Sequence, residues 1–94
     1  MHVSSDSRVA DAEVTLPPGV DLHARPAADF VRAAMRFSAQ VWVAAGEREV
    51  DAKSLLSILA LGAKAGTGLR LRAEGADAPA AVAALAATVG SLSE

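Results

Sequence analysis

The chain has no cysteine and no tyrosine, and its aromatic residues are one tryptophan and two phenylalanines. Without cysteine there are no disulfide bonds, thiolate catalysis or cysteine-ligated metal centres, as is typical of a reducing compartment. The shortage of aromatic side chains argues against a sheet that stacks RNA bases. Nine basic residues face eleven acidic ones, and the net charge is −2. No overall basic field therefore attracts nucleic acid.

Long apolar runs and targeting signals are also missing. No stretch approaches the roughly 20 apolar residues of a membrane-spanning helix, which predicts no direct membrane insertion. Residues 1–12 lack the cationic start and apolar stretch of a secretory signal, so we expect a flexible N-terminal tail on a cytoplasmic protein. Residues 13–94 are expected to form a single domain with one modest core. No residue spacing predicts a metal or cofactor site.

Periodicity predicts alternating strands and helices. Helices are expected at residues 26–36, at 55–61 and after Asp77, and strands at 13–16, 40–44, around Val50 and at 69–73. Pro26 suits a first helical turn, and Ser54 and Asp77 suit helix N-caps. The resulting order, βαββαβα with two-faced strands, predicts an α/β (α+β) fold. We expect a two-layer open-faced sandwich, with a four-stranded, mainly antiparallel sheet and three helices on one face.

The segment Leu-His-Ala-Arg-Pro-Ala-Ala at residues 22–28 places a histidine and an arginine at the entrance of a predicted helix. A helix start offers backbone N–H groups without internal partners, which suit a phosphate. The neutral ring of His23 can attack a phosphoryl group, and Arg25 adds forked donors for its oxygens. A solvated histidine at a helix start is nevertheless the commoner case. The pair alone therefore does not identify a function.

The same segment resembles the active site of HPr, the histidine-containing phosphocarrier family of the bacterial phosphoenolpyruvate-dependent sugar phosphotransferase system. The resemblance covers residues 13–94 and keeps the family's order and spacing. It continues through Ala-Lys-Ser-Leu-Leu at 52–56, Leu-Gly at 61–62, Gly-Thr at 66–67 and Ala-Glu-Gly at 73–75. It implies the open-faced sandwich that the periodicity predicts independently. It also implies a stoichiometric phosphoryl carrier, and not a turnover enzyme.

The resemblance assigns roles to the residues around the histidine. His23 would accept a phosphoryl group on its δ nitrogen from phosphorylated enzyme I and pass it to a sugar-specific enzyme IIA. Arg25 matches the phosphate-neighbouring arginine of the family. Ala24 and Pro26 lie at the helix start that positions the phosphate. The family further suggests a monomer.

Partner docking and regulation are implied by the same resemblance. Ser54 matches the serine that HPr kinase/phosphorylase modifies in many Gram-positive relatives, although a helix N-cap explains it equally well. Leu56 is the best single docking candidate, because Leu55 and Ile58 equally suit the core. The positions that match the family's docking surface are Ala24, Arg25, Ala28, Arg32, Leu55, Leu56, Leu59 and Lys64.

One dipeptide departs from the family pattern. Val20-Asp21 stands where many members have Asn-Gly. Valine supplies no amide side chain to the loop, and Asp21 brings a carboxylate close to a site for a dianion. The negative charge of Asp21 would favour the protonated ring of His23, or would weaken phosphate retention by like-charge repulsion. In the other interpretation, Asp21 points into water and is screened.

Two alternatives to a general phosphocarrier stay open. One is a specialised HPr paralogue that serves nitrogen control, dihydroxyacetone kinase or transcriptional regulation. The other, more remote, is a non-catalytic module that binds through its open sheet. Trp42 is expected on the uncovered face of that sheet, where it either marks a contact surface or packs locally.

Overall fold

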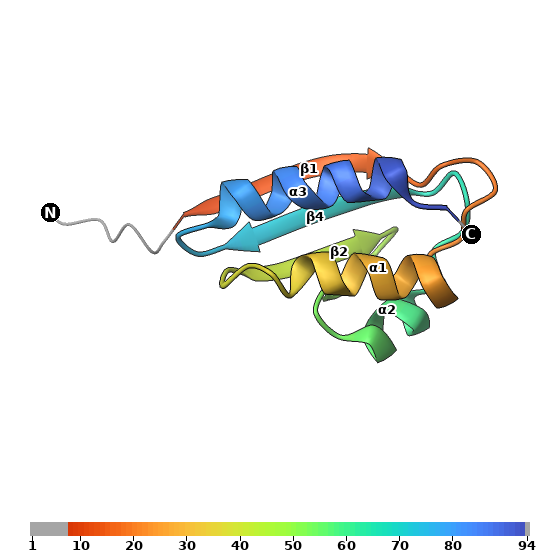
Figure 1. Cartoon of the computed structure of the whole chain (residues 1–94), viewed down its shortest axis with the longest axis horizontal. Coiled ribbons are helices and arrows are strands. Elements are labelled where there is room, and N and C mark those ends of the chain that lie inside the picture. Colours follow the sequence, from red (N-terminus) through yellow and green to blue (C-terminus); the bar gives the residue numbers. More distant parts are fainter. Residues whose placement is uncertain (1–7, 94) are drawn as a thin grey trace, which may run out of the picture.

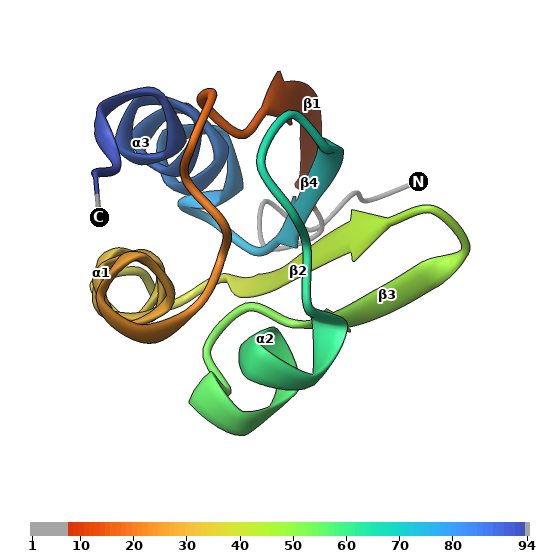
Figure 2. The same ribbon diagram turned by 90° about the vertical axis from the view of Figure 1, so that its right-hand side faces the viewer.

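The structure is a computed structural model that describes residues 8–93. Its elements follow in the order β1 (Val9–Thr15), α1 (Ala24–Ala34), β2 (Gln40–Ala45), β3 (Arg48–Asp51), α2 (Leu55–Leu61), β4 (Gly68–Glu74) and α3 (Ala78–Ser91). The strands form one antiparallel sheet in the order β1-β4-β2-β3. The helices lie on one side of this sheet (Figures 1 and 2). The predicted open-faced sandwich is confirmed.

The core lies between the sheet and the helices, and the apolar spacing accounts for it. In β4, Leu69 and Leu71 are buried against the helices, while Arg70 between them is exposed on the open face. Phe30 is the largest fully buried side chain and lies on the apolar side of α1. An apolar stripe at helical spacing along α3 is also buried. It comprises Val82, Leu85, Val89 and, just beyond the helix, Leu92.

The predicted bounds of two elements were wrong. The first strand begins at Val9, which pairs with Glu74, so the tail predicted for 1–12 does not include residues 9–12. Ala10 and Ala12 lie at the inward positions of this strand but carry too little apolar surface to mark it, and apolar Val9 lies at an exposed position. Residues 1–7 of that predicted tail lie outside the described residues. The first helix spans Ala24–Ala34, two residues earlier at each end than predicted.

Asp77 precedes α3 as predicted, but its side chain does not cap that helix. Its carboxylate accepts hydrogen bonds from the backbone N–H groups of Ser38, at 2.9 Å, and Ala39, at 2.8 Å. The bond from Ser38 contributes most to lowering the pKa of Asp77 below its ordinary value of 3.8. Through these hydrogen bonds, Asp77 connects the loop before β2 to the start of α3.

This hydrogen bonding predicts a pH dependence of stability. Since the folded-state pKa is the lower one, Asp77 contributes stability above about pH 4 and loses it as the pH falls through the folded value. Asp77→Asn should therefore flatten the fall of the melting temperature as the pH drops below about 4. Thermal unfolding followed by circular dichroism measures this slope. Asp11→Asn, on exposed β1, is the control and should keep the wild-type slope.

Candidate functional site

His23 is the N-cap residue of α1, with an extended backbone and an exposed side chain. Ala24, the next residue, has a φ of +48°, and among residues 8–93 no other non-glycine residue has a positive φ. This left-handed conformation costs about 1 kcal/mol or more. Pro26 is buried in the first helical turn, as its fixed φ favours. The chain thus enters α1 through a sharp, strained turn that leaves the His23 ring facing outward.

Two loops meet beside this turn, at the right-hand end of Figure 1. The backbone N–H of Leu22 donates to the carbonyl of Ala63, at 2.8 Å. The backbone N–H of Ala65 donates to the Asp21 carboxylate, also at 2.8 Å. The side chains of Val20 and Leu22 are buried and anchor the first loop to the core. The interpretation that Asp21 simply points into water is therefore wrong, because it holds the loop that follows α2.

The meeting of the loops forms a small pocket of about 150 Å³ that His23 lines. Asp21, Leu22, Gly62, Ala63 and Lys64 form the rest of its wall. The sequence predicts that Lys64 belongs to the docking surface, but it does not predict that Lys64 lines a pocket together with His23. Gly62 ends α2 with a left-handed φ of +63°, and this turn brings the loop back toward His23. A glycine after the last helical residue is typical of a helix end, but the direction of the turn depends on the fold.

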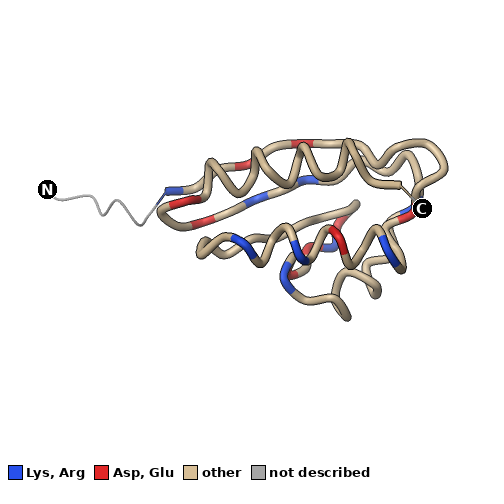
Figure 3. The backbone as a smooth tube through the Cα atoms, in the orientation of Figure 1, with Lys and Arg blue, Asp and Glu red and all other residues tan. Residues whose placement is uncertain are grey.

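Arg25 lies exposed in the first turn of α1. Among the residues that the structure describes, its side chain has no hydrogen-bond or ion-pair partner. Arg32, about two turns further along α1, is paired with Asp29. Figure 3 shows several basic segments along α1, with one acidic segment between them. Arg25 is therefore available to an incoming anion, whereas Arg32 is partly neutralised by its neighbour.

The short helix α2 packs against α1 and exposes part of its apolar surface. Leu56 is 80% exposed and Leu55 42% exposed, while Ile58 is fully buried. Leu59 and, on α1, Ala28 are half-buried. The helix α2, which carries the exposed Leu55 and Leu56, lies on the same side of the sheet as α1 (Figure 2).

Ser54 caps α2, as predicted. Its hydroxyl oxygen accepts a hydrogen bond from the Ser57 backbone N–H, at 3.2 Å. The helix spans only seven residues, so one satisfied amide is a large share of its end stabilisation.

Ser54→Ala should lower the free energy of unfolding by about 1 kcal/mol, because the amide of Ser57 loses its partner. Urea denaturation measures the change. Ser57→Ala removes a hydroxyl from the same turn but keeps the cap, and should change stability by less than about 0.5 kcal/mol. Equal losses in the two variants would contradict a capping role.

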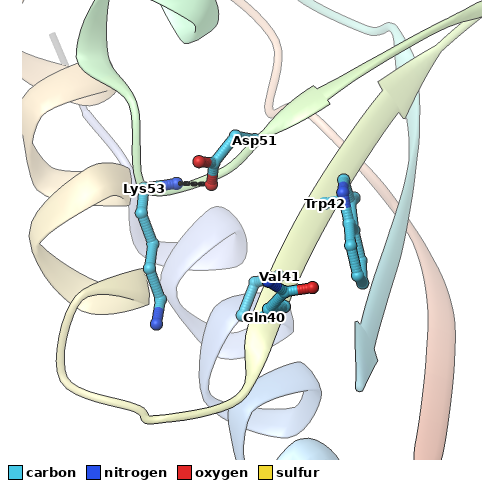
Figure 4. A pocket seen from close by; sticks show the side chains of 5 residues that line it. All are labelled: Gln40, Val41, Trp42, Asp51 and Lys53. Carbon is cyan, nitrogen blue, oxygen red and sulfur yellow. Dashed lines mark hydrogen bonds between the residues drawn. The ribbon is translucent and has the colours of Figure 1, made fainter. Parts of the chain in front are cut away.

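A second hollow lies away from the histidine. It measures about 450 Å³ and is lined by Gln40, Val41, Trp42, Asp51 and Lys53 (Figure 4). The guanidinium of Arg72 lies 4.1 Å from the centre of the Trp42 ring. The Arg72 guanidinium donates a hydrogen bond to the Glu49 carboxylate, at 3.1 Å, and this bond raises the pKa of Arg72. Trp42 is thus half-buried, and its ring packs against Arg72 on the open face of the sheet. This contact favours local packing over a free contact surface.

Two further classes of site are absent from the described part of the chain. None of the helices over residues 8–93 has the length and apolarity needed to cross a bilayer. In the same range, no group of three or more histidine, aspartate or glutamate side chains is placed to hold a metal ion.

The fold and the site together define an open-faced α/β sandwich domain with an exposed histidine at the start of its first helix. Residues 10–91 match the family model described as "PTS HPr component phosphorylation site". Phosphocarrier protein HPr of Haemophilus influenzae is 39% identical over 82 residues, which cover 87% of this chain and 94% of the relative. The chain belongs to the HPr family of phosphocarrier proteins.

Two further similarities agree with this assignment. A crystal structure of HPr from Thermoanaerobacter tengcongensis superposes with a TM-score of 0.83 at 39% identity, over 87% of this chain and 92% of that one. A multiphosphoryl transfer protein of Xanthomonas campestris is 44% identical over 79 residues. That alignment covers 84% of this chain but only 9% of the relative's length.

Proposed function

We propose that this chain carries phosphoryl groups on His23, receiving them from phosphorylated enzyme I and delivering them to an enzyme IIA. The observation that supports this best is the exposed ring of His23 at the N-cap of α1, beside an unengaged Arg25. Both residues fall within the part of the chain that matches the HPr family model. We also propose that the chain acts as a single-domain monomer in the cytoplasm.

The proposed transfer requires little chemistry from the protein. The lone pair of the His23 δ nitrogen forms the new bond to phosphorus, while the donor atom leaves with the electron pair of the broken bond. The guanidinium of Arg25 and the N–H groups at the start of α1 hold the phosphoryl oxygens. Delivery to the acceptor is the same step in reverse. The protein therefore contributes mainly orientation and charge.

The partners would dock around the histidine. We propose that Ala24, Arg25, Ala28, Arg32, Leu55, Leu56, Leu59 and Lys64 form the docking surface. Highly exposed Leu56 offers the apolar centre that such surfaces use, and the surrounding cations would steer acidic partners. Modification of Ser54 by HPr kinase/phosphorylase would add negative charge at the edge of this surface.

The direct test is incubation with phosphoenolpyruvate and enzyme I, followed by intact mass spectrometry. One added phosphoryl group that is labile in acid and stable in base is expected. Ser54→Ala should keep this label, because the acid-labile group is not on the serine. A chain that gains no mass with an enzyme I that labels another HPr would overturn the proposal. A panel of enzyme IIA acceptors then separates a general carrier from a specialised one.

A further inference from the structure

The pocket beside His23 is built from two loops that are far apart in the sequence. Asp21 precedes the histidine, and Lys64 follows α2. Both line the pocket with His23. Arg25, the first cation near the histidine, lies on α1. Lys64 adds a second cation from the loop between α2 and β4.

We propose that Lys64 is a second cationic contact for the phosphoryl group on His23, and that Asp21 is the positioning residue that holds Lys64 there. This inference rests on the proposed function and deepens it. It gives Lys64 a role in retaining the phosphoryl group, in addition to its docking role.

The backbone hydrogen bonds on either side of Lys64 carry the argument for Asp21. The carbonyl of Ala63, one residue before Lys64, accepts from the Leu22 N–H, at 2.8 Å. The N–H of Ala65, one residue after it, donates to the Asp21 carboxylate, at 2.8 Å. The residues on both sides of Lys64 are therefore hydrogen-bonded to the loop that leads into His23. Loss of either bond would free the loop that carries Lys64.

The side chain of Lys64 is suited to the role. It is exposed, and within residues 8–93 it has no hydrogen-bond or ion-pair partner. An ammonium group acts as a compact point charge that can approach phosphoryl oxygens without a fixed orientation. A pocket of about 150 Å³ has room for a group of phosphoryl size next to the histidine.

The expected effect is on the lifetime of the phosphorylated protein. Hydrolysis breaks the nitrogen–phosphorus bond, returns the electron pair to the ring nitrogen and joins a water oxygen to phosphorus, giving free histidine and inorganic phosphate. The transition state is loose. Because the electron pair of the breaking bond passes to the ring nitrogen, the phosphoryl oxygens are less negative in the transition state than in the bound dianion. A cation at these oxygens therefore stabilises the bound state more and slows hydrolysis.

The first experiment separates this role from docking. The protein is phosphorylated with phosphoramidate, a small donor that needs no partner, and the half-life of the label is followed by intact mass at neutral pH. Lys64→Ala should shorten the half-life about threefold, the size expected for one partly exposed charge pair. Lys64→Arg should restore it. Arg36→Ala removes an exposed cation beyond the end of α1 and should leave the half-life unchanged.

The second experiment is a double-mutant cycle between the two residues. Asp21→Ala should shorten the half-life to a similar extent, and the variant that combines it with Lys64→Ala should be no shorter-lived than Lys64→Ala alone. Asp21→Asn keeps an oxygen that can accept the Ala65 N–H, so it should last at least as long as wild type. If Asp21 acted only by repelling the phosphoryl group, Asp21→Ala would lengthen the half-life.

The outcomes distinguish the two proposals. Equal half-lives in wild type and Lys64→Ala overturn the inference about Lys64 and leave the carrier function intact. Additive effects in the double variant overturn the positioning role of Asp21. Labelling at a residue other than His23 would overturn the proposed function itself.

Discussion

His23→Ala is expected to abolish the acid-labile phosphoryl label completely. Alanine has no nitrogen that can form a bond to phosphorus, and Arg25 can hold a phosphate but cannot accept one. Incubation with phosphoenolpyruvate and enzyme I, followed by intact mass, should show only the unmodified chain. The substitution should cost little stability, because the His23 side chain is exposed and makes no capping hydrogen bond.

The chain provides a matched control for this experiment, since it contains only one other histidine, His2. His2→Ala should take up the label at the wild-type rate. Arg25→Ala should still be labelled but more slowly, by about ten- to a hundredfold, because charge stabilisation is lost while the nucleophile stays. A persistent acid-labile label in His23→Ala, with a wild-type melting temperature, would place the acceptor elsewhere.

Phe30→Ala is expected to have the largest effect on stability, a loss of about 3–5 kcal/mol in the free energy of unfolding. Phe30 is fully buried on the inner face of α1, and no larger side chain is fully buried among the described residues. A chain of this size is stabilised by only about 5–14 kcal/mol in all. Urea denaturation at 25 °C should therefore show a midpoint well below that of wild type.

Phe37→Ala removes the same side chain at a half-buried position just after α1. It should cost about 1–2 kcal/mol, because less apolar surface returns to water and solvent can fill the space. Similar losses for the two variants would mean that the core is not centred on Phe30 as the structure shows. Phe30→Leu, which refills part of the cavity, should recover much of the loss.

Several elements follow from local chemistry and were therefore predictable. Ser54 and Gly62 carry the start and stop signals of α2, and the predicted span of that helix agrees with the structure. The strand at β4 was found because Leu69 and Leu71 alternate with arginines. By contrast, β1 begins earlier than predicted, since alanines at its first inward positions carry almost no periodic signal. Asp77 looked like a cap from its position, but its carboxylate serves the loop before β2.

The residues of the candidate site were likewise only partly predictable from the sequence. The histidine, the arginine and the proline lie within one short segment, so residues 22–28 determined the predicted acceptor. The family resemblance rested on this segment together with the matching segments further along the sequence. The sequence also determined the order of the elements, because hydrophobic periodicity is a local property. Only the tertiary structure decided that Asp21 binds the Ala65 amide and that Lys64 lies beside His23. These residues are separated by α1, β2, β3 and α2. Their meeting therefore depends on how the sheet and helices pack, which local patterns do not encode.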